Sequence, residues 1–105
     1  MSDQPIERIL CAAIKYEDFK RPAHGPKNVY EGVVLCGLRH SSIISQCSSL
    51  LGKRQAEMGE YEQGFLTNQN RFVGREEGLT IALAANQVID HSQVKAGKLY
   101  SEALY

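Results

Sequence analysis

The sequence predicts an α+β fold, in which two helices pack on one face of a small, mostly antiparallel sheet. Short apolar segments of strand length occur at residues 9–14 and 32–38, and segments with helical spacing begin near residues 41 and 75. Polar connections that contain glycine and proline separate these segments. A chain of 105 residues with this order of elements is typical of one α+β domain spanning residues 1–105.

The first part of the chain is expected to supply two strands. Residues 7–16 contain the run ILCAAI, which lacks clean alternation and is typical of a strand buried on both faces, although a buried helical segment fits the same run. Residues 19–28 are expected to form a loop because prolines and a glycine interrupt any regular element. The run GVVLCGL at residues 32–38 predicts the second strand.

The first helix is predicted from apolar residues that recur at the spacing of one helical face. These residues are Ile43, Ile44, Cys47, Leu50 and Leu51. Ser41 or Ser42 is the expected N-cap, and Gly52 is the expected stop. Residues 53–61 are charged and have no apolar period, so we expect a loop there.

The stretch from residue 62 to residue 89 predicts a strand, a tight turn and a helix. Residues 64–67 are extended in character, and the polar triplet at residues 68–70 is typical of a turn. The second helix is expected to follow Gly74 and to continue to Ile89, with two acidic residues in its first turn, where the helix dipole favours them.

The end of the chain and the sheet edges favour association with further copies. Residues 98–105 predict either a closing strand or a tail that docks on a neighbouring subunit through Leu99, Tyr100, Leu104 and Tyr105. Small domains bury a smaller share of their surface, and open sheet edges need cover. We therefore expect a homo-oligomer.

Composition excludes several classes of function. Twelve basic and twelve acidic residues give no net charge, which weighs against a partner such as a DNA or RNA polymer or an anionic membrane. No apolar run approaches the roughly 18 residues of a membrane span. The polar N-terminus is unlike a signal peptide, so we expect a cytoplasmic protein. The three cysteines form no CxxC motif, which favours reduced core thiols and predicts no metal site and no cofactor.

Both predicted helices begin beside basic residues: Arg39–His40 before the first, and Arg71 and Arg75 at the second. Helix N-termini bind anions, and guanidinium groups pair with phosphate oxygens, so phosphate is the expected ligand group. The aromatic faces of Phe65 and Phe72 could hold the rest of a nucleotide. The alternative interpretation is that both phenylalanines belong to the core and the arginines are solvated.

Catalysis has little support in the sequence. Cys36 lies in an apolar run and is expected to be an inert buried thiol. His40 is the candidate general base, but no nucleophile is evidently paired with it, and no carboxylate pair is suitably spaced.

Five blocks of the chain resemble one family of phage proteins. The blocks are ERILCAAIKY, HGPKNV, GVVLCGLRH, EQGFLTNQNRFVGREE and KLYSEALY. They are similar to the first described family of phage Thoeris anti-defence proteins, α+β proteins that form homodimers or hexamers. The resemblance implies that the chain acts in the cytoplasm of the infected bacterial host cell. It would there sequester a cyclic nucleotide signalling molecule without cleaving it: glycocyclic ADP-ribose and, at a separate site, the cyclic di- or trinucleotides of CBASS.

The matching blocks also imply which residues contact the ligand. These positions are Arg39, His40, Phe65, Thr67, Asn70, Arg71, Phe72 and Arg75. The chain departs from the family pattern at Leu38, where a basic residue is common, and at Gly74 and Ala103, where acidic residues are common. Two alternative functions stay open at this point: an enzyme that degrades the signal with His40 as base, and an inhibitor that docks directly on a defence enzyme.

Overall fold

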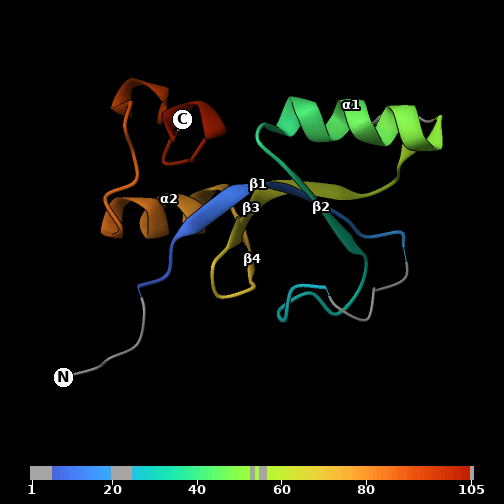
Figure 1. Cartoon of the computed structure of the whole chain (residues 1–105), viewed down its shortest axis with the longest axis horizontal. Helices are drawn as coiled ribbons and strands as arrows, with labels where there is room; N and C mark the ends of the chain where they lie inside the picture. Colours follow the sequence, from blue (N-terminus) through green and yellow to red (C-terminus); the bar gives the residue numbers. More distant parts are fainter. Residues whose placement is uncertain (1–5, 20–24, 53, 55–56, 105) are drawn as a thin grey trace.

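The computed structural model describes residues 6–19, 25–52, 54 and 57–104. These residues form a four-stranded antiparallel sheet, two α-helices and two short 3-10 helices (Figure 1). The strands lie in the order β2-β1-β3-β4, with β1 at Ile9–Tyr16, β2 at Val33–Gly37, β3 at Tyr61–Thr67 and β4 at Phe72–Gly74. The helices are α1 (His40–Leu51), α2 (Arg75–Ala84), η2 (His91–Gln93) and η3 (Ser101–Ala103). The predicted α+β class is confirmed.

Strand β1 is the centre of the sheet and pairs with both β2 and β3. Its register against β3 shifts between Ile9 and Cys11, which inserts a bulge at this end of the strand. The bulge lets Ile9 turn into the core while Leu10 stays exposed. Beyond it, Ala12 and Ile14 point to the same side and are fully buried.

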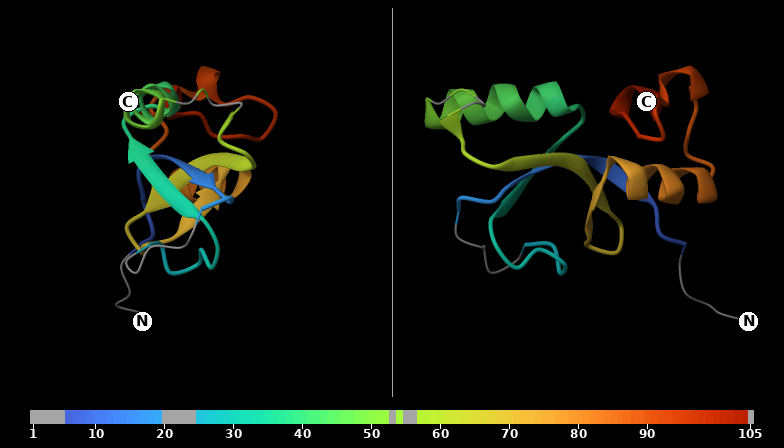
Figure 2. Two further views of the ribbon diagram at one scale, coloured as in Figure 1. Left: turned by 90° about the vertical axis from the view of Figure 1, so that its right-hand side faces the viewer. Right: turned by 180° about the vertical axis from the view of Figure 1, so that it is seen from behind.

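Both helices contribute to one hydrophobic core on the same face of the sheet. Ile43 of α1 and Ala82 of α2 join Ile14 of β1 and Phe65 of β3 in this core. The helices lie over opposite ends of the sheet (Figures 1 and 2). Helix α2 approaches closely because Gly78 has no side chain, and a Cβ there would lie 3.1 Å from the ring of Phe65.

The opposite face of the sheet carries a smaller cluster of Ala13, Val29 and Phe72. The loop before β2 covers this face and also the outer edge of β4. The side chain of Asn28 accepts a hydrogen bond from the Phe72 backbone N–H at 2.8 Å and donates one to the Phe72 carbonyl at 2.6 Å. Asn28 thus satisfies the backbone hydrogen-bonding groups of Phe72 at the edge of β4, as a neighbouring strand would. Strand β2 forms the other edge of the sheet.

Three predicted boundaries near the first helix and the middle strands need correction. Helix α1 begins at His40, and the residue at its N-cap is the extended Arg39 rather than Ser41 or Ser42. Strand β3 begins at Tyr61, within the stretch expected to be a loop, and β4 was not predicted as a strand. Gly52 ends α1 with a left-handed φ of 66°, as expected.

The second helix is shorter than predicted, because it ends at Ala84 rather than Ile89. Asn86 has a left-handed φ of 56°, which breaks the helix. The side-chain amide of Gln87 then binds the Ile9 backbone twice, at 2.8 Å to its N–H and 2.9 Å to its carbonyl. These bonds draw the chain toward β1.

The described end of the chain packs on its own core and forms a 3-10 helix instead of the predicted closing strand. Leu99 and Ala103 are fully buried and Leu104 is 9% exposed, while Tyr105 lies outside the described residues. The carbonyl of Ala103 accepts hydrogen bonds from the N–H groups of Ile89 and Asp90 at 2.8 and 3.2 Å. Leu99 and Leu104 therefore give no reason to expect a neighbouring subunit. No helix in the described part of the chain is long and apolar enough to cross a membrane.

Candidate ligand-binding site

A groove of about 320 Å³ lies at the start of α2, between this helix, β3 and the C-terminal segment. Its lining residues are Glu62, Gln63, Gly74, Arg75, Glu76, Glu77 and Lys98. The volume lies at the lower end of the range typical of small-molecule sites. Gly74 is the N-cap and supplies no side-chain hydrogen bond to the first turn of the helix. The lining combines two cations with three carboxylates, so it is not simply an anion site.

Arg75 joins the groove to the C-terminal segment. Its Nη1 donates to the Leu99 carbonyl at 2.8 Å, and its Nη2 donates to Gln63 Oε1 at 2.6 Å. The guanidinium carbon lies 4.4 Å from the centre of the Tyr100 ring, in cation–π geometry. Burial lowers the pKa of Arg75 from its usual value. The predicted ligand residue is thus also a structural clamp.

Arg71 belongs to an ionic cluster that anchors the start of β1 to the turn after β3. Its Nε and Nη2 donate to the carboxylate of Glu7 at 2.8 and 2.7 Å, and Nη2 also donates to Glu77 at 3.0 Å. Thr67 Oγ1 donates to Glu7 at 2.7 Å. The hydrogen bond from Arg71 holds the pKa of Glu7 below its usual value. In this conformation Arg71 binds the carboxylates of Glu7 and Glu77, whereas the sequence predicted that it would bind a phosphate.

His40 lies on the core side of β3, at the start of α1. Its Nε2–H donates to the carbonyl of Gly64 at 2.7 Å, and its ring packs edge-on against Phe65 at 5.2 Å between centres. Burial lowers the pKa of His40, and the nearby Arg75 lowers it further. The two predicted helix starts therefore do converge on β3. His40 is only 8% exposed, however, and Arg39 beside it is half-buried.

The remaining predicted contacts are turn and core residues. Phe65 and Thr67 are fully buried and Phe72 is 5% exposed, so in this conformation neither aromatic ring can stack on a base. For these two rings the structure matches the alternative interpretation. Asn70 is exposed, and its left-handed φ of 58° forms the turn. Its carbonyl accepts a hydrogen bond from Lys27 N–H at 2.9 Å.

Of the seven residues that line the groove, only Arg75 was a predicted ligand contact; sequence reasoning missed Glu62, Gln63, Gly74, Glu76, Glu77 and Lys98. The strand was expected to begin only at residue 64, so the alternation that turns Gln63 and Glu62 to opposite faces of β3 was not considered. Lys98 was assigned either to a closing strand or to a tail that docks on a neighbouring subunit, and neither alternative placed it beside the second helix. No cluster of three or more potential metal-ligating side chains occurs among the residues that the structure describes.

The fold and the groove define a small α+β protein with a mixed-charge cleft at a helix start. Residues 8–105 match the family described as Phage T4 y16D protein, and the chain belongs to this family. The family description names a phage protein and no activity. No curated protein and no solved structure matches the chain.

Proposed function

We propose that this chain is a phage-encoded binding protein that sequesters a cyclic nucleotide signal of bacterial anti-phage defence without cleaving it. Glycocyclic ADP-ribose isomers are the first ligand class, and cyclic di- and trinucleotides are the second. Membership of a family described by a phage protein supports a phage origin. The sequence blocks that resemble Thoeris anti-defence proteins support the ligand class.

The observation that carries the proposal is the mixed lining of the groove at the start of α2. Arg75 and Lys98 offer positive charge for phosphate oxygens, together with the first-turn N–H groups of the helix. Glu62 can accept hydrogen bonds from ribose hydroxyls or base amino groups, as carboxylates do in nucleotide-binding folds. A cyclic nucleotide supplies both kinds of partner, whereas a simple inorganic anion supplies only acceptors and would meet three carboxylates.

The environment of His40 favours binding over the enzymatic alternative. A general base must reach the proton that it removes. The Nε2 of His40 already donates to the Gly64 carbonyl, and the ring is buried against Phe65. This arrangement gives the imidazole a structural role in holding α1 on β3.

The experiment is a depletion assay with purified protein and single candidate signals. The protein is mixed with glycocyclic ADP-ribose, a cyclic dinucleotide or pyrophosphate and removed by filtration, and the ligand left in the filtrate is measured. We expect stoichiometric depletion of a cyclic nucleotide and none of pyrophosphate. Equal depletion of pyrophosphate would show that the groove binds anions without selectivity for cyclic nucleotides. No depletion of any cyclic nucleotide would contradict the proposal.

Lys98 and Lys95 offer a matched pair of variants for locating the site. Both side chains are exposed, but Lys98 lines the groove and Lys95 does not. Removing one charge-assisted bond of ~1.5–3 kcal/mol weakens binding roughly tenfold to a hundredfold. We expect this loss for Lys98→Ala and unchanged affinity for Lys95→Ala. The same affinity in both variants would move the site away from the groove.

A further inference from the structure

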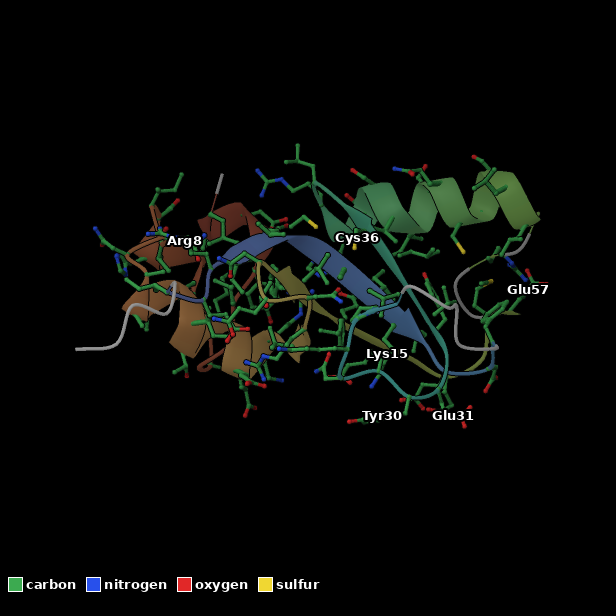
Figure 3. The ribbon with its side chains drawn as sticks, turned by 60° about the horizontal axis from the view of Figure 1, so that its bottom comes forward. Arg8, Lys15, Tyr30, Glu31, Cys36 and Glu57 are labelled. Carbon is green, nitrogen blue, oxygen red and sulfur yellow. The ribbon has the colours of Figure 1, made fainter. Side chains whose placement is uncertain are left out.

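Two cysteines lie side by side on the face of the sheet away from the helices. Cys36 of β2 is next to β1 (Figure 3), where its register partner is Ala13. Cys11 lies two residues before Ala13 and therefore projects from the same face, diagonal to Cys36. The two thiols lie close enough for each to shift the pKa of the other. Ala13 is small, so no bulky side chain separates them.

The pair is accessible, which corrects the expectation that Cys36 is a buried inert thiol. Cys36 is exposed and Cys11 is half-buried, whereas Cys47 is buried with its Sγ 3.8 Å from Met58 Sδ. Cys11 also lies at the bulge of β1. Bulges re-aim side chains and recur beside functional sites.

The contact between the thiols gives them different reactivities. The hydrogen bond from Cys36 lowers the pKa of Cys11 to about 7, and the same interaction raises the pKa of Cys36. This lower pKa favours the thiolate form of Cys11 relative to an ordinary cysteine. Because the thiolate is the nucleophile, Cys11 is the group that reacts first with an oxidant.

We propose that Cys11 and Cys36 are a peroxide-responsive thiol pair that closes into a reversible disulfide between β1 and β2. The Cys11 thiolate attacks one oxygen of hydrogen peroxide and breaks the O–O bond, which gives a sulfenic acid and hydroxide. The Cys36 sulfur then attacks the sulfenic sulfur, loses its proton and expels a second hydroxide. The two protons released by the thiols convert the hydroxides to water, so two thiols and one peroxide yield one disulfide and two waters.

Closure requires the two strands to shift. Diagonal neighbours have Cβ atoms up to ~7 Å apart, and a disulfide needs ~4 Å. Strand β2 is an edge strand paired only with β1, so it can move toward Cys11. Cys36 lies just before the connection through Leu38 and Arg39 to α1, which begins at His40. A shift of β2 on oxidation would therefore also move this connection.

The test treats the reduced full-length protein with hydrogen peroxide and follows the intact mass and the disulfide-linked peptides. We expect each chain to lose two hydrogen atoms through a link between Cys11 and Cys36, and dithiothreitol to restore the original mass. Cys47 is the internal control, and it should remain a free thiol that is alkylated only after denaturation. In Cys36→Ser, dimedone should trap the sulfenic acid of Cys11, because no second thiol is present to resolve it.

Three outcomes would overturn the proposal. One is oxidation of wild-type Cys11 to the sulfinic acid with no intramolecular link. Another is a disulfide only between chains. The third is equal alkylation rates of Cys11, Cys36 and Cys47 in the folded reduced protein near pH 7, since this would remove the difference in thiolate character.

Discussion

The ion pair between Arg71 and Glu7 should couple the start of the chain to the turn after β3. The pair is bidentate, at 2.7 and 2.8 Å, and its side chains are only 28% and 17% exposed. Exposed pairs contribute ~0.2–1 kcal/mol, whereas hydrogen bonds to charged groups contribute ~1.5–3 kcal/mol. For this partly buried pair we expect a coupling free energy of about 1–2 kcal/mol.

A double-mutant cycle measures this coupling directly. The free energy of unfolding in urea is compared for Arg71→Ala, Glu7→Gln and the double variant. The control is a second cycle between Arg71 and Glu77. Glu77 makes one bond to Arg71 at 3.0 Å and is 54% exposed, so the coupling free energy of this pair should stay below ~0.5 kcal/mol. A coupling for Glu7 no larger than that for Glu77 would refute the reasoning.

Acid should remove the same coupling. Folding lowers the pKa of Glu7 from its usual 4.5. The stabilisation is thus fully present above the unfolded pKa and is lost as the pH falls through the folded pKa. Repeating the Glu7 cycle in progressively more acidic buffer should give a declining value, and a constant value would argue against an ionic origin.

Three further predictions concern His40, two glycines and Arg75. Because burial lowers the pKa of His40, the unfolded chain binds more protons as the pH falls from the usual pKa of about 6.5 through the lower folded pKa. In this window the stability of the wild type should fall faster than that of His40→Gln in thermal melts. A Cβ at Gly64 would overlap the backbone carbonyl of Val73 in β4, so Gly64→Ala should cost ~3 kcal/mol in urea unfolding; Gly52→Ala, with open space around it, should cost only ~1–2 kcal/mol. Arg75→Lys keeps the charge but loses the planar fork, so amide hydrogen exchange should speed up in the C-terminal segment, and unchanged exchange would argue against the clamp.

The elements with strong local signals could be predicted from the sequence. The apolar spacing of α1 and the glycine after it predicted that helix to within two residues at its start. The end of α2 could not be predicted, because the apolar pattern continues past Ala84 and the chain is drawn away by contacts distant in sequence, such as the one between Gln87 and Ile9. Strand β4 has three residues, and its outer edge is satisfied by Asn28, which is distant in sequence.

The sequence predicted little of the groove itself. It placed a strand, a turn and a helix start next to one another at residues 64–75, but among its candidate ligand residues only Arg75 lines the groove. The sequence does not show which arginines form ion pairs with carboxylates distant in the chain. Arg71, for example, pairs with Glu7, which is 64 residues away. Likewise, an aromatic residue on a strand gives no sign of which face it occupies until the register is known, and Phe65 faces the core.

The proposed sequestration claims that the bound signal stays intact, and this claim separates it from the enzymatic alternative. To protect a phage, binding must outcompete the host sensor, which requires a nanomolar or lower Kd, or about −12 kcal/mol. The decisive measurement saturates the protein with the cyclic nucleotide, removes unbound ligand, incubates for increasing times and then releases the ligand by heat for chromatography. The account predicts near-stoichiometric recovery of the original cyclic nucleotide at every time point. A linear or hydrolysed product that accumulates with time would contradict it and would make the protein an enzyme.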